Sequence, residues 1–162
     1  EAAPVAQELH ARQAFLDAMM SVHPMQGAVG TIRALQERGY KVIVISGGID
    51  LIVEAVYGKE VSSLFQEIFI NRYQFGPDGK LMGVTPAKYD IDNKAQCVKD
   101  MIQQYGADPK NCVYVGNNEN DTEAALIVGT SVAFNSKSER LVEVATHHVE
   151  SKDIFDILKF IP

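Results

Sequence analysis

The chain has 162 residues, a length typical of one domain that buries a sizeable core. Hydrophobic residues make up 46% and charged residues 22%, which excludes a disordered or low-complexity chain. The net charge is −6 and basic residues form no run, so we expect neither nucleic acid nor an anionic membrane as a partner. No uncharged apolar run approaches ~18 residues, and therefore no bilayer-spanning segment is predicted.

The two cysteines indicate a reducing environment. Cys97 and Cys112 each lie in an apolar stretch, and they are too few for a disulfide scaffold or a zinc site. We predict that both are buried free thiols and that the protein is cytoplasmic. The chain begins at Glu1 rather than Met and shows no signal peptide, which indicates a processed, trimmed or excised polypeptide.

The first segment is predicted to be an amphipathic helix of about eighteen residues, closed by Pro24. No strand precedes it. We treat residues 1–24 as a separate helical element and residues 25–162 as one core domain. The apolar positions of the helix are Leu9, Phe15, Leu16, Met19, Met20 and Val22.

From Gly27 onward, strand-like and helix-like segments alternate, which predicts an α/β fold with a mostly parallel sheet. A helix before Gly39 places Val29, Ile32 and Leu35 on one face. The β-branched run Lys41–Ser46 is typical of a strand buried on both faces. A second helix follows Gly47-Gly48.

The remaining elements follow the same alternation, with one hairpin in the middle. The turn residues between Phe75 and Lys80 predict a hairpin, and Asp92 or Asn93 caps a helix that runs to about Tyr105. The other predicted elements are a buried strand at Cys112–Val115, strands at Ser131–Phe134 and His148-Val149, and closing helices near 138–145 and 152–159.

Ser46-Gly47-Gly48 is the first candidate site, because it lies where a predicted strand meets a helix. Ligands of open α/β sheets bind beyond the carboxyl ends of strands, and helix N-termini offer N–H groups to anions. Ser46 could donate its hydroxyl to a phosphate oxygen, while Gly47 lets backbone amides approach. A tight turn with a helix-capping serine explains the same residues equally well. A dinucleotide fingerprint, G-x-G-x-x-G, is absent.

The second candidate is the segment from Gly116 to Ala125, which follows the strand at Cys112–Val115. Its oxygen-bearing side chains suit Mg²⁺ and a phosphate, although an Asn-rich turn with Asp121 as a helix cap is the alternative. Lys94 begins a predicted helix, where a cation is unfavourable against the helix dipole. A phosphate contact would explain it; otherwise it is a solvated surface lysine.

In this order and spacing, the two strand ends and Lys94 resemble motifs two, three and four of the haloacid dehalogenase (HAD) superfamily. The resemblance is strongest to its phosphoserine phosphatase branch and covers roughly residues 25–162. Further shared residues are Asn71-Arg72, the stretch Asp78–Gly83 and the closing segment that begins at Asp156.

The resemblance implies a Rossmann-like core and Mg²⁺-dependent hydrolysis of a phosphorylated small molecule. In this family an aspartate attacks phosphorus, and a second aspartate two residues on acts as the acid/base. Lys94 is the one catalytic residue that carries over, as the cation that neutralises the nucleophile and the phosphate. The implied phosphate contacts are Ser46, Gly47, Lys94 and Asn120, and the implied Mg²⁺ ligands are Asn117 and Asp121, with Asn120 in the same loop.

The sequence departs from the family in two ways. The first motif, D-x-D-x-T, is missing, and the single Asp-x-Asp at Asp90-Ile91-Asp92 is interpreted as a loop and helix cap. Motif four normally opens Gly-Asp, whereas Gly116 is followed here by Asn117. A neutral amide brings no charge to Mg²⁺, so we expect weak metal affinity.

The missing motif also removes a strand. In the family this strand lies between the strands that end here at Ser46 and Val115. We therefore expect an incomplete HAD core that lacks its first strand and most of its cap, with residues 1–24 as a cap remnant. A companion chain or a second copy of this chain would fill the place of the strand.

Three hypotheses follow. The chain is the C-terminal part of a phosphoserine-phosphatase-like hydrolase, inactive without the missing segment. Alternatively, it is a non-catalytic HAD-like binding or regulatory module, which Asn117 favours. A structural or interaction domain without a ligand is the third.

Overall fold

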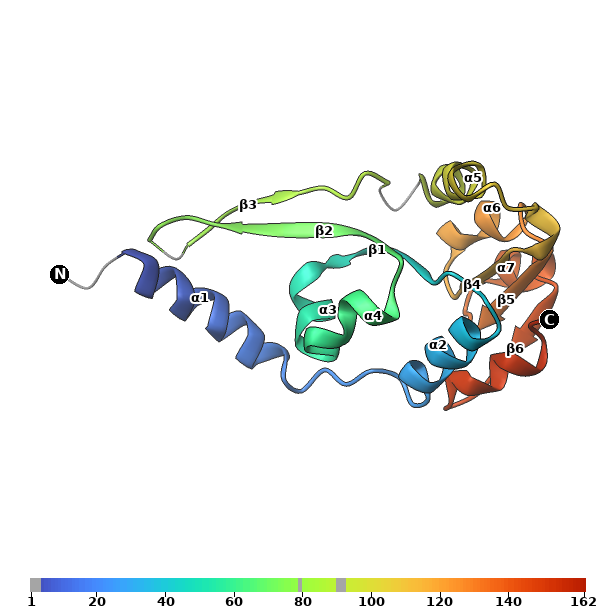
Figure 1. The fold of residues 1–162 in the computed structure, drawn as a ribbon, viewed down its shortest axis with the longest axis horizontal. Coiled ribbons are helices and arrows are strands. Elements are labelled where there is room, and N and C mark those ends of the chain that lie inside the picture. Colours follow the sequence, from blue (N-terminus) through green and yellow to red (C-terminus); the bar gives the residue numbers. More distant parts are fainter. Residues whose placement is uncertain (1–3, 79, 90–92) are drawn as a thin grey trace. The chain divides into compact units, whose positions relative to one another are not determined.

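The computed structural model describes residues 4–78, 80–89 and 93–162 (Figure 1). The predicted loop and cap at Asp90-Ile91-Asp92 lie outside the described residues, as does Gly79 of the predicted turn. The chain divides into two compact units. Unit 1 comprises the described parts of 1–24 and 41–90, and unit 2 those of 25–40 and 91–162. That residues 1–24 form a separate element and 25–162 one domain stays a prediction.

Unit 1 is built on a three-stranded sheet of order β1-β2-β3. The strands β1 and β2 are parallel, with Ile43 opposite Glu67, whereas β2 and β3 are antiparallel, with Arg72 opposite Thr85. Its elements are α1 (Pro4–Met19), β1 (Ile43–Ile49), α3 (Asp50–Tyr57), η1 (Gly58–Glu60), α4 (Val61–Leu64), β2 (Glu67–Phe75) and β3 (Leu81–Thr85).

The predicted hairpin is confirmed, since β2 and β3 pair and the Gly76 N–H donates to the Lys80 carbonyl at 2.9 Å. The predicted end of the first strand is wrong. The strand β1 continues through Ser46 to Ile49, with an irregular register between Ile45 and Ile49, and α3 starts only at Asp50. Residue type alone suggested a turn at Gly47-Gly48. In the structure the two glycines instead allow the strand to continue with an irregular register.

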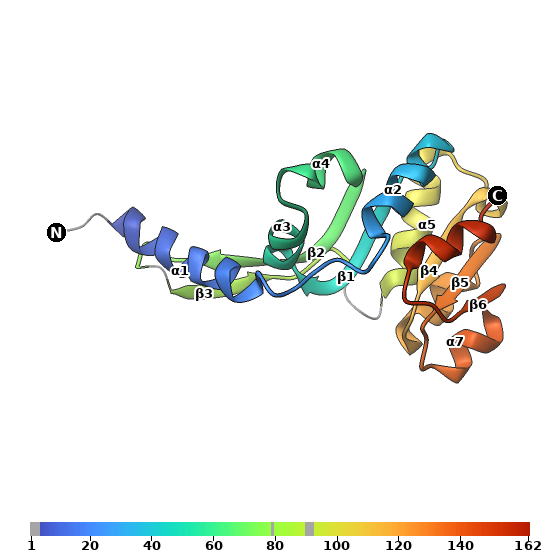
Figure 2. The same cartoon turned by 90° about the horizontal axis from the view of Figure 1, so that it is seen from below.

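The predicted first helix is confirmed as α1. Figure 1 shows α1 running obliquely to the β2–β3 hairpin toward α3, and in Figure 2 the helix overlaps the hairpin. Phe15 packs edge-on against Tyr73 and Phe75, with ring centroids 5.9 and 5.6 Å apart. The helix ends at Met19, before Pro24, and Met20 is 72% exposed. The last two residues of the predicted apolar face, Met20 and Val22, are therefore exposed, because the helix ends before them.

Unit 2 has a fully parallel sheet of order β4-β5-β6. Its elements are α2 (Ala28–Glu37), α5 (Lys94–Tyr105), η3 (Pro109–Asn111), β4 (Val113–Gly116), η4 (Glu119–Asp121), α6 (Thr122–Ala125), β5 (Thr130–Phe134), α7 (Glu139–Val144), β6 (His147–Val149) and η5 (Ile154–Lys159). The α/β class with mostly parallel pairing is confirmed. The last predicted helix forms a 3₁₀ helix rather than an α-helix.

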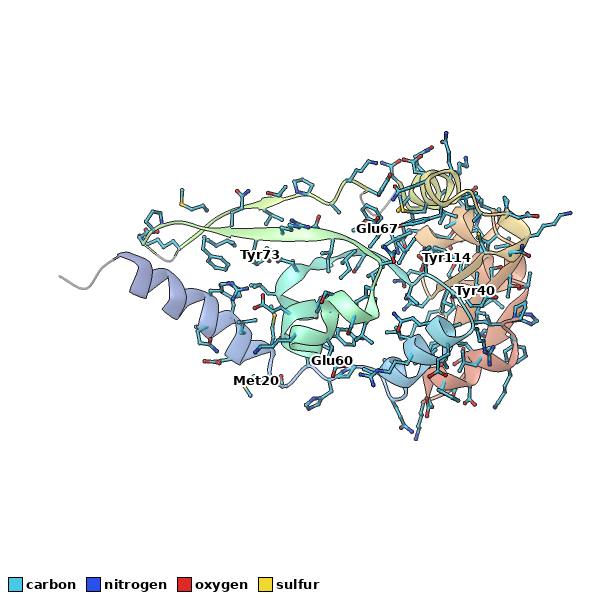
Figure 3. The ribbon with its side chains drawn as sticks, viewed as in Figure 1. Met20, Tyr40, Glu60, Glu67, Tyr73 and Tyr114 are labelled. Carbon is cyan, nitrogen blue, oxygen red and sulfur yellow. The ribbon has the colours of Figure 1, made fainter. Side chains whose placement is uncertain are left out.

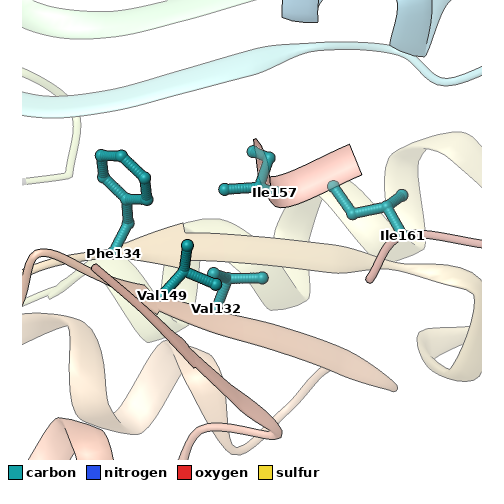
Figure 4. Close-up of a cluster of buried hydrophobic side chains, with 5 residues drawn as sticks. All are labelled: Val132, Phe134, Val149, Ile157 and Ile161. Carbon is teal, nitrogen blue, oxygen red and sulfur yellow. The ribbon is translucent and has the colours of Figure 1, made fainter. Parts of the chain in front are cut away.

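One hydrophobic cluster joins the sheet of unit 2 to the end of the chain (Figure 4). Leu35 of α2 packs against this cluster, as the predicted helix face requires, and Gly39 ends the helix region with φ 87°. Arg38 donates to the carbonyls of Leu158 and Ile161 at 3.3 and 2.9 Å, which holds the C-terminal segment. The buried members of the cluster are Val132, Phe134, Val149, Ile157 and Ile161.

The two strands expected to be buried on both faces are only partly buried. Among the described strands, β1 pairs with β2 alone and β4 with β5 alone, so each is an edge strand of its own sheet. Val115 of β4 is 37% exposed. Of the two free thiols, Cys97 is buried as predicted, but Cys112 is half-exposed beside this edge strand. None of the described helices combines the length and apolar character that crossing a membrane requires.

Candidate phosphate-binding site

The centre of the candidate site is an ion pair in unit 2. The Nζ atom of Lys94, the first residue of α5, lies 2.7 Å from Oδ1 of Asp121 at the end of η4. Their side chains are 12% and 3% exposed. Buried charges need a close partner, and this pair supplies one for each. The structure thus excludes the alternative that Lys94 is a solvated surface lysine.

The carboxylate of Asp121 accepts four hydrogen bonds. Oδ1 receives the Tyr114 hydroxyl at 2.7 Å in addition to Lys94. Oδ2 receives the backbone N–H groups of Asn117 and Asn118 at 2.9 and 3.0 Å. A carboxylate has about four acceptor sites, so the capacity of Asp121 is filled.

These hydrogen bonds set the charge state of the site. Burial alone would raise the pKa of Asp121, but bonds from Lys94, the Asn118 N–H, the Tyr114 hydroxyl and the Asn117 N–H together lower it below its usual value. Burial and the nearby Asp121 carboxylate raise the pKa of Tyr114. At neutral pH, Asp121 is therefore an anion and Tyr114 a protonated donor.

The local sequence explains why Asp121 reaches this position. Asn118 and Asp121 form a capping box, in which each side chain accepts from the backbone N–H of the other. Gly116 leaves room for the carboxylate, because a Cβ atom there would lie 2.5 Å from Cβ and 2.6 Å from Cγ of Asp121. From the sequence, Asp121 could be either a helix cap or a site residue. In the structure it has both roles, because its side chain caps the turn and also pairs with Lys94.

The residues of this loop do not by themselves fit Mg²⁺. Among the described residues, no three His, Cys, Asp or Glu side chains gather in a way that could hold a metal. Asp121 would have to give up Lys94 or another donor to bind a metal, and Asn117 offers only a neutral amide. The Asn117 side chain is exposed and that of Asn120 is half-buried.

The other predicted phosphate contacts, Ser46 and Gly47, lie within β1 of unit 1. The Gly48 N–H donates to Ser46 Oγ at 3.0 Å, which leaves the hydroxyl proton of Ser46 available to an acceptor. The helix α3 begins after Ile49, and its N-cap has no side-chain bond. The alternative of a helix-capping serine is therefore wrong.

Asn71 of β2 fixes the backbone beside Ser46. Its Nδ2 donates to the Gly47 carbonyl at 2.9 Å, and its Oδ1 accepts from the Ala87 N–H at 2.9 Å. One side chain thus joins the end of β1 to the segment that follows β3.

Sequence reasoning assigned no site role to Asn71 or Tyr114. A polar Asn inside a strand is unfavourable and was the available signal for Asn71. Tyr114 carried only a weak signal, as the one hydroxyl-bearing residue of a short apolar strand directly before the loop.

A parallel sheet with a lysine and a carboxylate gathered near the carboxyl end of β4 is the arrangement of a Rossmann-like α/β protein. A family model of haloacid dehalogenase-like hydrolases matches residues 1–129. The chain belongs to this family.

The relatives of the chain include phosphoserine phosphatases. That of Methanocaldococcus jannaschii is 34% identical over 145 residues, which cover 89% of this chain and 66% of the relative. That of Haemophilus influenzae is 31% identical over 115 residues, which cover 70% of this chain and 35% of the relative. The chain therefore spans from about a third to just under two thirds of these relatives.

Solved structures agree with this placement. A phosphoserine phosphatase in its apo form has a TM-score of 0.73 at 32% identity, covering 86% of this chain and 68% of that one. A phospho-aspartyl intermediate analogue of phosphoserine phosphatase has a TM-score of 0.72 at 28% identity, covering 97% and 81%. The predicted phosphoserine phosphatase-like branch and the Rossmann-like fold class are confirmed.

Proposed function

We propose that this chain supplies the phosphate-binding part of a phosphomonoester hydrolase that acts on phosphoserine or a similar small phosphorylated molecule. The observation that carries the proposal is the buried Lys94 at the start of α5, held by Asp121. An ammonium group has three donors, and Asp121 takes one of them. Within the described residues the other two meet no acceptor, and we propose that they bind phosphate oxygens in charge-assisted hydrogen bonds.

Ser46 and Gly47 are proposed as further phosphate contacts on the strength of their motif. The hydroxyl proton of Ser46, left available by the bond from Gly48, supports that role. Asn120 is proposed as a phosphate contact and Asn117 as a metal contact by position in motif four. For Asp121 we propose the role of counter-ion to Lys94 rather than metal ligand, since its four acceptor sites are filled.

The nucleophile must come from outside these 162 residues, which contain no D-x-D-x-T motif. Covalent catalysis needs such a nucleophile, so the chain alone should not hydrolyse phosphoserine or p-nitrophenyl phosphate above background. The Mg²⁺ that the family resemblance implies would likewise need carboxylates beyond those described here. A reducing, cytoplasmic setting is proposed from the two free cysteines.

Phosphate binding tests this function without turnover. Binding of inorganic phosphate to the chain is measured by ³¹P NMR or calorimetry, for the unaltered protein and for Lys94→Met. Lys99→Met is the matched control, because Lys99 is an exposed lysine of the same helix. We expect Lys94→Met to abolish most of the binding and Lys99→Met to leave it intact. Equal affinity in all three proteins would contradict the proposal.

A non-catalytic phosphate-binding module is the second candidate, favoured by Asn117. The two candidates differ when a companion polypeptide carrying D-x-D-x-T after an apolar strand is added with Mg²⁺. A hydrolase part gains phosphoserine hydrolysis that depends on Lys94. A binding module still binds phosphate but gains no turnover, even in the Asn117→Asp variant.

A further inference from the structure

We infer that Tyr114 is a positioning residue that holds Lys94 in place through Asp121. The inference rests on the proposed function, in which the Lys94 ammonium binds phosphate. Tyr114 lies in β4, two residues before Gly116, and is labelled in Figure 3. Its hydroxyl donates to Asp121 Oδ1 at 2.7 Å, the same oxygen that Lys94 contacts at 2.7 Å.

The two oxygens of Asp121 have different partners. In the part of the chain that the structure describes, Oδ2 accepts only from the backbone of its own loop, at Asn117 and Asn118, and thereby secures the turn. Among the described residues, Oδ1 accepts only from side chains of other elements, one from α5 and one from β4. Because the turn is already fixed through Oδ2, the Tyr114 bond is not needed to form it. The bond acts on the oxygen that holds the lysine.

Tyr114 restricts where Lys94 can lie. An sp² oxygen offers two acceptor directions, and the Tyr114 hydroxyl occupies one of them. The ammonium of Lys94 is then confined to the other. Without the hydroxyl, Lys94 could bond to Oδ1 from either direction, and water could take the vacant one. If the ammonium is divided between two positions and only one of them binds the anion, the apparent affinity falls with the fraction of lysine in that position.

Tyr114→Phe removes one oxygen atom and keeps the ring. Because Tyr114 acts on phosphate only through Lys94, only part of the energy of the lost hydrogen bond reaches the phosphate, and we expect phosphate affinity roughly 3- to 10-fold weaker. The matched control is Tyr40→Phe, in which a hydroxyl that bonds to the Pro162 carbonyl at 3.2 Å is removed in the same unit. Both tyrosines are labelled in Figure 3. We expect unchanged phosphate affinity in Tyr40→Phe.

Two readouts separate positioning from a structural role. First, the Lys94 side-chain NMR signal should broaden or split in Tyr114→Phe and stay single in Tyr40→Phe. Second, Tyr114→Phe should have no further effect on phosphate affinity in a Lys94→Met background, since it acts through that lysine. An unchanged Lys94 signal, or an equal loss of residual affinity in both backgrounds, would overturn the inference.

The unaltered chain gives an independent measurement should Tyr114→Phe fail to fold. Titration with inorganic phosphate should shift the side-chain signals of Tyr114 and Lys94 together and leave that of Tyr40 in place. If the Lys94 signal shifts and the Tyr114 signal does not, the inference is contradicted but the proposed function is preserved. Absence of any phosphate binding contradicts the proposed function, and the inference about Tyr114, which rests on that function, falls with it.

Discussion

Asp121 has two tasks, one for each oxygen of its carboxylate. One oxygen closes the turn after β4, and the other accepts from Lys94 and Tyr114. The carboxylate is 3% exposed, so its charge is tolerated only because every acceptor site is filled. A change at this single position should therefore alter both the loop and the lysine.

The lowered pKa of Asp121 predicts that the free energy of unfolding falls at acidic pH, a fall that we call the acid limb. A carboxyl with a lowered folded-state pKa contributes stability above its unfolded pKa of about 3.9, and this contribution is lost as the pH falls through the folded-state value. Asp121→Asn should lower stability at neutral pH and flatten its fall below about pH 4. Thermal melts between neutral and acidic pH measure both effects. Glu143→Gln, an exposed carboxylate of α7, should keep the limb; an equally steep limb in Asp121→Asn would contradict the assignment.

Gly116 should not tolerate a side chain. A Cβ atom there would meet Cβ and Cγ of Asp121 at 2.5 and 2.6 Å, so Gly116→Ala must displace the carboxylate. We expect a loss of about 1–3 kcal/mol in the free energy of unfolding, measured by urea denaturation. Gly30→Ala in α2 is the control, since its Cβ would lie 3.7 Å from Phe155 and a helical alanine should be neutral or stabilising. Equal stability of the two variants would refute this account.

At the scale of elements, the end of β1 depends on its neighbours more than on its own residues. Ser46, Gly47 and Gly48 have weak strand preference, yet β1 extends through them to Ile49. Asn71 of β2 supplies a side-chain bond to the Gly47 carbonyl at the point where the register is irregular. The neighbouring strand thus positions the predicted phosphate contacts.

Asn71→Ala should loosen this end of β1. It removes the donor to Gly47 and leaves the Ala87 N–H without its acceptor, which should cost about 1–3 kcal/mol in unit 1. Hydrogen exchange should speed up at Gly48 and Ala87. Gln74→Ala removes an exposed side-chain bond to Thr85 of the same hairpin and should leave both amides protected. Unchanged exchange in Asn71→Ala would show that the backbone needs no such support.

The short helix η5 closes the core of unit 2 with one face only. Ile157 is 2% exposed within the cluster of Figure 4, whereas Phe155, two residues earlier, is 48% exposed. Ile157→Ala should therefore cost about 2–5 kcal/mol in unfolding free energy by leaving a cavity. Phe155→Ala should cost much less. Chemical denaturation of both variants tests this, and a larger loss in Phe155→Ala would place the core elsewhere.

At the scale of the molecule, each unit has a sheet with an open edge beside its candidate site residues. The strands β1 and β4 each have one described neighbour, and their ladder groups on the other side can pair with a further strand. The family to which the chain belongs, and the partial coverage of its relatives, agree with an incomplete sheet.

We predict that the 162-residue chain self-associates when it is alone. When a companion polypeptide is added, the chain should bind that polypeptide instead. Unpaired strand edges favour such pairing. Sedimentation equilibrium should show a mass above the 17.8 kDa of one chain. A strand peptide bearing D-x-D-x-T should reduce self-association, whereas a scrambled peptide should not. A monomer with a single cooperative unfolding transition would contradict this prediction.

Much of the fold could be predicted from the sequence, because local patterns encode it. Apolar spacing predicted α2, α3 and α5, and β-branched runs predicted β1, β4 and β5 within a few residues. The motif residues Ser46, Lys94 and Asp121 could be selected as candidates because their types suit phosphate and their places follow strand ends.

Other features were decided by tertiary structure alone. Sequence spacing does not show that Lys94 and Asp121 share a hydrogen bond, that Tyr114 donates to the same oxygen, or that β1 continues past two glycines. Each of these depends on how separate elements come together, because the groups meet only when the strands pair, the loop after β4 turns back and α5 packs. Residue type and periodicity determine which elements form, because they act over one or two turns. The partners of a buried charge are determined by which elements lie around it, since only the folded chain removes the water that would otherwise satisfy it.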